Sequence, residues 1–223
     1  TSARDGQPFI AGPAGGPQKK YCTALIGEHQ ALNATVALAA LEQVRRAGLL
    51  VQDDAIRDGF LHVDWPGRLE VVQRTPLLVL DAAHNGASAQ LLAASLADLF
   101  PQRPVALIFG ASADKDIDSM FDALLPMADY LVAAQAVHPR ALSVEEIAAR
   151  AHAKGYDGPI FKVPAAQAAL ECASELVGPE GLICTTGSLF IVGEMRTVCG
   201  LPVGHVLPAT QQPASPSGAT PSN

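Results

Sequence analysis

The chain has 223 residues, of which 49 % are hydrophobic and 17 % are charged, and its formal net charge is −7. Disorder throughout is excluded, because disordered chains combine low hydrophobicity with high charge, and the acidic balance disfavours a basic nucleic-acid binder. The longest apolar runs are far below the roughly 18 residues that indicate a membrane span, and no signal-peptide pattern is present. We therefore expect a soluble protein with a substantial core, whose partners include neither nucleic acid nor a membrane.

The first part of the chain predicts helices. The GPAGGP stretch at 12–17 is interpreted as a loop, because no helix follows it. Residues 27–47 predict a helix, since apolar residues such as Leu32 and Val36 recur there at helical spacing. A second, shorter helix is predicted at 52–60.

The chain then changes to a rhythm of strands and helices. WPGRLEVVQ at 65–73 predicts a turn followed by a strand. Further strands are predicted at 76–80, 105–110, 129–135, 158–163 and 181–188, and helices at 88–100, 118–127, 143–154 and 165–177, with a last helix within 188–198. Strands separated by helices of this length imply right-handed βαβ units. We therefore expect an α/β fold, with a Rossmann-like, mainly parallel sheet and helices on both faces.

The end of the chain and the cysteines are less informative. The last residues are rich in Pro, Ser, Ala and Thr, which predicts a disordered tail at 206–223. The four cysteines form no CxxC pair, and no histidine pair has the spacing of a zinc site. Cys172 and Cys184 lie in apolar stretches and are interpreted as buried free thiols, which fits a reducing cytoplasm best.

Polar clusters follow several of the predicted strands, where ligands bind in an open parallel sheet. They are the residues 81–85, 112–116, 135–140 and 185–188. Taken singly, each has an ordinary explanation: Asp81 could cap the following helix, and the DKD sequence could be a solvated turn. No GxGxxG, GxxxxGK[ST] or GxSxG motif is present, so this chain would supply only part of any nucleotide site.

Six short motifs carry a resemblance. They are IGEHQALNA at 26–34, WPGRLEVV at 65–72, LDAAHN at 80–85, FGASADKD at 109–116, HPRA at 138–141 and TGSLFIVGEMR at 186–196. In these motifs, from about residue 21 to 196, the chain resembles the C-terminal half of the folylpolyglutamate synthase/dihydrofolate synthase family, within the Mur ligase superfamily. The resemblance implies an ATP-dependent, amide-forming ligase that joins L-glutamate to a pteroate or folate carboxylate through an acyl phosphate. The resemblance also implies a monomer.

The resemblance also implies a division of the chain. Residues 1–64 would be the final segment of a P-loop ATPase domain, 65–75 an interdomain linker, and 76–205 the C-terminal Rossmann-like domain. The start at Thr1 would then be a cut inside the ATPase domain. ATP and Mg²⁺ are the expected cofactors; the P-loop, the modified lysine and the metal ligands lie upstream of the matched residues, so no metal ligand is assigned here.

For the nucleotide, the resemblance assigns Asn33 to the adenine end of ATP, Arg68 to the phosphates and Asp81 to the ribose. His84 and Asn85 are expected to line the same cleft, with His84 either as a catalytic acid or base or as a packing partner of the nucleotide. The family usually has Gly-Ala-His-Asn-Pro after the aspartate; here alanine stands at 82 and glycine at 86, which puts the shape of this loop in doubt.

For the amino acid, Lys115 is expected to hold an anionic substrate and to act in catalysis, or else to form an internal ion pair of small value. Arg140 and Ser188 are expected near the glutamate pocket. His29 is interpreted as structural, because it positions the start of its helix.

Two alternatives stay open. One is another Mur-type amide ligase, such as a peptidoglycan or cyanophycin enzyme, although WPGR and GEHQ favour the folate branch. The other is a non-catalytic Rossmann-like module that binds a nucleotide or an amino acid, which only the missing P-loop supports. We expect this chain alone to be inactive in phosphate transfer from ATP.

Overall fold

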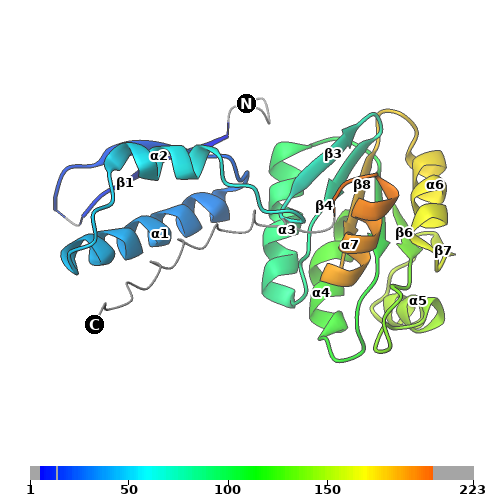
Figure 1. Ribbon diagram of the computed structural model, residues 1–223. Coiled ribbons are helices and arrows are strands. Elements are labelled where there is room, and N and C mark those ends of the chain that lie inside the picture. Colours follow the sequence, from blue (N-terminus) through cyan, green and yellow to red (C-terminus); the bar gives the residue numbers. More distant parts are fainter. Residues whose placement is uncertain (1–5, 14, 203–223) are drawn as a thin grey trace, which may run out of the picture.

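A β-hairpin and two helices form the smaller of two units in the chain (Figure 1). The computed structural model describes residues 6–13 and 15–202, and it pairs β1 (Gln7–Ala11) with β2 (Lys19–Thr23) in antiparallel register. Helix α1 (Glu28–Arg46) packs mainly on β1, and α2 (Asp53–Leu61) packs on β2. Both helices were predicted, whereas the hairpin was not, because its strands have only five residues each.

Helix α1 does not pack with the face that its apolar spacing suggested. Ala34 and Leu38 are buried with Phe9 of the hairpin in a small core, whereas Leu32 and Val36 are 65 % and 63 % exposed. The helix is apolar on both faces, so periodicity alone could not choose the inner one. The position of the hairpin determines which face of α1 is buried.

The larger unit is built on a six-stranded sheet in the order β3-β4-β8-β5-β6-β7. The strands are β3 (Glu70–Arg74), β4 (Leu77–Leu80), β5 (Val105–Phe109), β6 (Tyr130–Ala133), β7 (Ile160–Lys162) and β8 (Leu182–Thr186). Strands β4, β8, β5, β6 and β7 run parallel to one another, which confirms the predicted, mainly parallel sheet. Strand β3 joins the edge antiparallel to β4, so the segment that we expected to link two domains also contributes a strand to the sheet.

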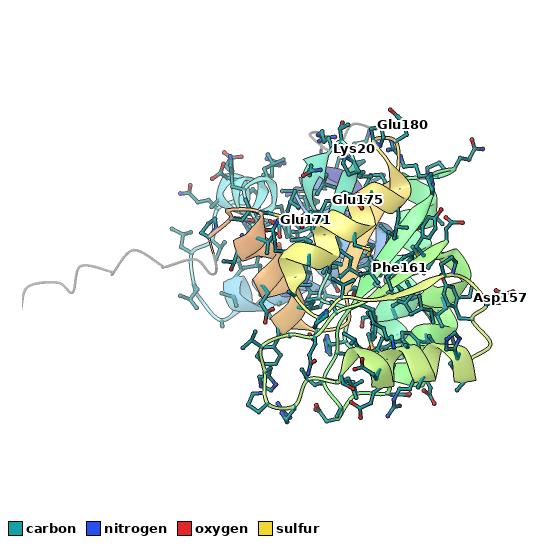
Figure 2. The ribbon with its side chains drawn as sticks, turned by 90° about the vertical axis from the view of Figure 1, so that its right-hand side faces the viewer. Lys20, Asp157, Phe161, Glu171, Glu175 and Glu180 are labelled. Atoms are coloured by element: carbon teal, nitrogen blue, oxygen red, sulfur yellow. The ribbon has the colours of Figure 1, made fainter. Side chains whose placement is uncertain are left out.

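Helices cover both faces of this sheet, as predicted. On one face lie α3 (Gly86–Leu99), α4 (Ile117–Leu124) and α5 (Val144–Ala153), with a 3₁₀ turn at Leu125–Met127. On the other face lie α6 (Ala166–Val177) and α7 (Leu189–Val198). Figure 2 shows α6 crossing its face with Glu171 and Glu175 along its solvent side. Every residue of β4, β5 and β8 is buried. Strands β4 and β5 are accordingly continuous apolar runs in the sequence, whereas β8 ends in the two buried threonines Thr185 and Thr186.

Two smaller expectations have different outcomes. Cys184 is fully buried on β8, where burial raises its thiol pKa, whereas Cys172 is only half-buried, so the expectation of a buried thiol was wrong there. The tail predicted at 206–223 lies outside the described residues.

Candidate functional site

The polar clusters named from the sequence meet at one edge of the sheet, the edge formed by the carboxyl ends of its parallel strands. Strands β4, β8, β5 and β6 are consecutive neighbours in the sheet and run parallel. The residues that follow them therefore lie side by side: Asp81 after β4, Ser188 after β8, Lys115 after β5 and Arg140 after β6. This is the edge at which open parallel sheets bind ligands.

Asp81 holds two backbone segments together. Its Oδ2 accepts the N–H of Leu69 at 2.8 Å, and its Oδ1 accepts the N–H of Ala83 at 2.9 Å. Burial raises the pKa of this carboxyl group, and the two hydrogen bonds oppose that shift. The side chain that caps α3 is Asn85, so the ordinary explanation of Asp81 as a helix cap was wrong.

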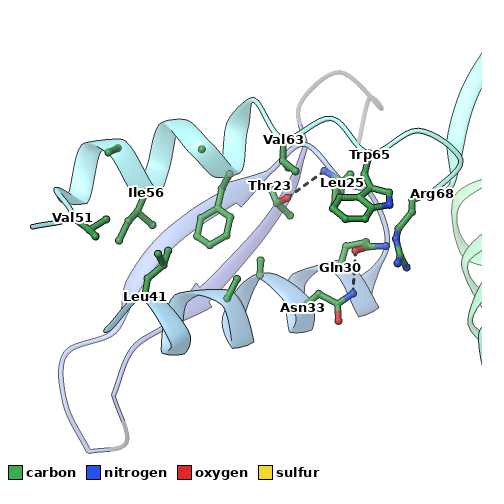
Figure 3. Close-up of a pocket in the computed structure, with 15 residues that line it drawn as sticks. Thr23, Leu25, Gln30, Asn33, Leu41, Val51, Ile56, Val63, Trp65 and Arg68 are labelled. Atoms are coloured by element: carbon green, nitrogen blue, oxygen red, sulfur yellow. Dashed lines mark hydrogen bonds between the residues drawn. The ribbon is translucent and has the colours of Figure 1, made fainter. Parts of the chain in front are cut away.

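Arg68 and Asn33 line the same cavity, of about 480 Å³, between α1, α2 and the hairpin. Figure 3 shows Trp65 and Arg68 at one end of it and Val51 and Ile56 toward the other. The remaining lining is mostly apolar. The exposed guanidinium of Arg68 lies 5.7 Å from the centroid of the Trp65 ring, which is within cation–π range. The cavity therefore combines a mostly apolar lining with a cation at one end.

The side chain of Asn33 is oriented by its neighbour on α1. Asn33 Nδ2 donates to Oε1 of the buried Gln30 at 3.2 Å. The amide group of Gln30 in turn lies 2.9 Å from Nε2 of His29. These polar side chains form one connected row at the end of α1 that faces the sheet.

His29 links this row to the sheet edge. Burial lowers its pKa, the charge of Asp81 raises it and the charge of Arg68 lowers it further. His29, Asp81 and Arg68 thus lie within electrostatic reach of one another, although they come from three separate segments. The interpretation of His29 as purely structural missed this proximity. Its place in the GEHQ motif was the only signal in the sequence.

His84 and Asn85 follow Asp81 in the same loop. His84 is exposed, and its Nδ1 lies 3.0 Å from the carbonyl oxygen of Ala82. A carbonyl oxygen only accepts, so Nδ1 of His84 is the donor in this contact. The side chain of Asn85 accepts the N–H of Ser88 at 2.8 Å and so forms the N-cap of α3. Asn85 therefore shapes the loop at this edge.

Lys115 and Arg140 share one carboxylate. Lys115 Nζ lies 3.8 Å from Asp114 Oδ2, and Arg140 Nη1 lies 3.5 Å from the same oxygen. The two loops are also joined by a backbone hydrogen bond of 2.9 Å between Ala113 N and Arg140 O. The carboxylate of Asp116 instead caps α4 through Ser119. Lys115 and Arg140 thus place two cationic side chains together, an arrangement that suits an anionic ligand.

Ser188 begins α7 and is only 5 % exposed. Its Oγ accepts the N–H of Ile191 at 3.3 Å, so the hydroxyl already has a structural partner. The preceding Gly187 has a φ of 110°, and a Cβ there would lie 2.7 Å from the carbonyl oxygen of Gly110. This glycine lets the ends of β5 and β8 approach closely at the candidate site.

Within residues 6–13 and 15–202, no group of three or more His, Cys, Asp or Glu side chains is placed to hold a metal ion. In the same ranges, no helix is both long and apolar enough to cross a membrane.

The family model "Mur ligase, glutamate ligase domain" matches residues 67–189. The dihydrofolate synthase/folylpolyglutamate synthase of Mycobacterium tuberculosis is 35 % identical over 201 residues, which cover 83 % of this chain and 41 % of that protein.

Two solved structures are similar over the same region. The folylpolyglutamate synthase of Mycobacterium tuberculosis complexed with ADP and AMPPCP superposes with a TM-score of 0.76 at 36 % identity, over 83 % of this chain and 44 % of that one. A bifunctional folylpolyglutamate synthase/dihydrofolate synthase with Mn, AMPPNP and L-glutamate bound gives a TM-score of 0.69 at 28 % identity, over 82 % and 43 %. The chain spans about two fifths of the length of these relatives.

Proposed function

The chain belongs to the Mur ligase family, in its folylpolyglutamate synthase/dihydrofolate synthase branch, and its residues 67–189 match the glutamate ligase domain. We propose from this premise that it works in a longer protein as part of an ATP-dependent ligase. That protein would add L-glutamate to dihydropteroate, to a folyl(poly)glutamate or to both. The observation that carries the proposal is the placement of Arg68, Lys115 and Arg140 around one sheet edge. ATP, when bound, supplies the phosphoryl group that activates the acceptor carboxylate.

The proposed domain division follows the two units. The hairpin with α1 and α2 has its own small core, which supports residues 1–64 as the end of an ATPase domain. The Rossmann-like domain is proposed for 76–205. The segment 65–75 would link the two, with β3 anchoring the linker to the sheet.

On the nucleotide side, we assign Asn33 and Arg68 to the base and the phosphates because both line the cavity in Figure 3. The planar fork of an arginine pairs well with phosphate oxygens. Asp81 is assigned to the ribose; each of its oxygens accepts one backbone N–H and retains a second lone pair. His84 and Asn85 complete this side of the cleft.

On the amino-acid side, we assign Lys115 and Arg140 to the carboxylates of L-glutamate, with Ser188 beside them. A charged pair of this kind orients an anionic substrate without needing a deep pocket. The acceptor nitrogen Nε2 of His84 is our candidate to take a proton from the incoming amine. Its Nδ1 contact with Ala82 keeps this nitrogen available.

The identity of the metal ion, the cellular location and the oligomeric state are also proposals. A relative binds Mn with AMPPNP, and we propose Mg²⁺ as the physiological ion, held by ligands outside the described residues. A cytoplasmic location is supported by the unpaired thiols of Cys172, Cys184 and Cys199. We propose a monomer, which size-exclusion chromatography with light scattering would test.

A phosphate-release assay on the complete protein tests the function. We expect release only when ATP, L-glutamate and either dihydropteroate or tetrahydrofolate are all present. Release with a different acid acceptor would indicate another Mur-type ligase. Binding of ADP without any turnover would instead indicate a non-catalytic module and would contradict the proposal.

A further inference from the structure

Arg68 lies between two residues whose backbone is left-handed. Gly67 has a φ of 72° and Leu69 has a φ of 43°. Glycine adopts such a conformation freely, but for a leucine it is unfavourable. Such a conformation persists only where the surrounding structure imposes it. The contacts around Leu69 show what imposes it here.

Two carboxylates hold the backbone on either side of Arg68. Oε2 of Glu70 accepts the N–H of Gly67 at 2.8 Å. Oδ2 of Asp81 accepts the N–H of Leu69, also at 2.8 Å. The side chain of Leu69 is only 1 % exposed and is packed in the main core. The backbone at Arg68 is therefore fixed on both sides, while its guanidinium group is exposed.

Glu70 is itself held by Arg196 of α7, 126 residues later in the chain. Nη1 of Arg196 donates to Oε1 of Glu70, and its Nη2 donates to the carbonyl oxygen of Pro202 at 2.9 Å. Arg196 is 7 % exposed, and its Nε has no hydrogen-bond partner among the described residues. Glu70 is partly buried, and an ion pair withdrawn from water contributes little net stability compared with apolar side chains of similar size. Its presence beside the Arg68 loop therefore suggests a role in geometry.

Helix α7 also contacts the loop directly. Val192, four residues before Arg196, lies on the same face of the helix. A Cβ on Gly67 would come within 2.9 Å of Cγ1 of Val192. Only a glycine thus lets the loop lie this close to α7. Arg196 and Val192 together make this helix the support on which the loop rests.

We propose that Glu70 and Arg196 are positioning residues that set the location of the Arg68 guanidinium group relative to the sheet edge. Glu70 fixes the N-terminal side of Arg68 through Gly67, and Arg196 fixes Glu70. The effect on a nucleotide phosphate rests on the proposed function, whereas the support of the loop by this pair does not.

Steady-state kinetics of the complete protein tests the effect on the nucleotide. Glu70→Gln leaves one side-chain oxygen where Gly67 and Arg196 need two, and Arg196→Lys cannot reach both Glu70 and Pro202. We expect each variant to lower kcat/KM for ATP about tenfold, because misplacement of a binding group weakens catalysis. The KM for L-glutamate should stay within about twofold. Gln73→Ala is the control on the same strand: it removes hydrogen bonds to the carbonyl oxygens of Thr75 and Pro76 and should leave these kinetic constants unchanged.

A double-mutant cycle separates positioning from general damage. If Glu70 acts through Arg68, adding Glu70→Gln to Arg68→Ala should change kcat/KM for ATP no further. An equal loss in both backgrounds, or a parallel loss for glutamate, would overturn the inference.

Amide hydrogen exchange gives a readout that does not depend on activity. We expect Glu70→Gln to speed exchange at Gly67 and Leu69, while the amides of β5 and β8 keep their protection. Unchanged exchange at both residues would overturn the inference whatever the kinetics show. If the wild-type protein has no ligase activity, the proposed function fails. The exchange data alone then test whether Glu70 and Arg196 hold the backbone around Arg68.

Discussion

The backbone N–H of Leu69 donates to Oδ2 of Asp81 at 2.8 Å, across twelve residues of sequence. This contact ties the segment that carries Arg68 to the end of β4. The second oxygen of the same carboxylate accepts from Ala83. One side chain thus closes the loop and shapes the polar cluster that follows the strand.

Removal of the Asp81 carboxylate should destabilise the fold. Asp81→Ala leaves the N–H groups of Leu69 and Ala83 without their acceptor, which should lower the free energy of unfolding by about 1–3 kcal/mol. Urea unfolding of the two proteins measures this difference. Asp98→Ala, at an exposed position on α3, is the control and should change it by less than about 0.5 kcal/mol. Equal effects of the two substitutions would contradict the role of Asp81.

The same residue should make stability depend on pH. Burial raises the pKa of Asp81 in the folded protein above its unfolded value. An acid shifted in this direction contributes stability that is present below the unfolded pKa and is lost as pH rises through the folded pKa. The stability of the wild type relative to Asp81→Asn should therefore fall as pH rises from about 4 toward 7. A relative stability that rises over this range would show that the hydrogen bonds outweigh burial.

Arg68→Ala should weaken the use of ATP in the complete protein. Loss of a charge-assisted pair with phosphate should raise the KM for ATP on the order of tenfold. Thermal stability should change little, because the side chain is exposed. Arg103→Ala is the matched control, since Arg103 precedes β5 at the opposite edge of the sheet and donates to the carbonyl oxygen of Glu180. Unchanged ATP kinetics in Arg68→Ala would remove this residue from the site.

Lys115→Ala and Arg140→Ala should weaken the use of L-glutamate and leave the stability of the fold nearly unchanged. Their ion pairs with Asp114 are solvent-exposed, so each substitution should change the free energy of unfolding by less than about 1 kcal/mol. Each should raise the KM for L-glutamate several-fold and make it more sensitive to salt. Lys20→Ala on the hairpin serves as the control. If Lys115→Ala and Arg140→Ala leave the KM for L-glutamate as it is in the control Lys20→Ala, the assigned pocket is wrong.

The core of the larger unit depends on Phe121. The centroid of its ring lies 4.7 Å from the ring centroid of Phe109, and both side chains are fully buried. Phe121→Ala should therefore lower the free energy of unfolding by about 3–5 kcal/mol, through lost burial and the cavity left behind. Leu50→Ala removes a side chain that is 91 % exposed and should have almost no effect. A small effect of Phe121→Ala would mean that the sheet and α4 are loosely packed.

The parallel sheet could be predicted because its central strands are buried on both faces. The runs at 76–80 and 105–110 are almost continuously apolar, and the run at 181–188 begins with apolar residues; helices of regular length separate the three. The polar clusters at the strand ends followed directly from that topology. Position relative to a strand end is a local signal, and it was sufficient to bring Asp81, Lys115 and Ser188 to one edge.

Contacts between distant segments had no such signal. Arg196 and Glu70 are 126 residues apart, and nothing in either motif indicates that they pair. The left-handed backbone of Leu69 is equally invisible, since leucine rarely adopts it. The hairpin was missed because its strands alternate little and are short. In each case tertiary packing determines the structure.

The most direct test of the ligase proposal is mass spectrometry of the folate product. The complete protein, incubated with ATP, L-glutamate and either dihydropteroate or tetrahydrofolate, should yield an acceptor heavier by one glutamyl residue. Omission of any component should abolish the product, and the 223-residue chain alone should form none. Failure of the folded, complete protein to form a glutamyl product with either acceptor would contradict the account.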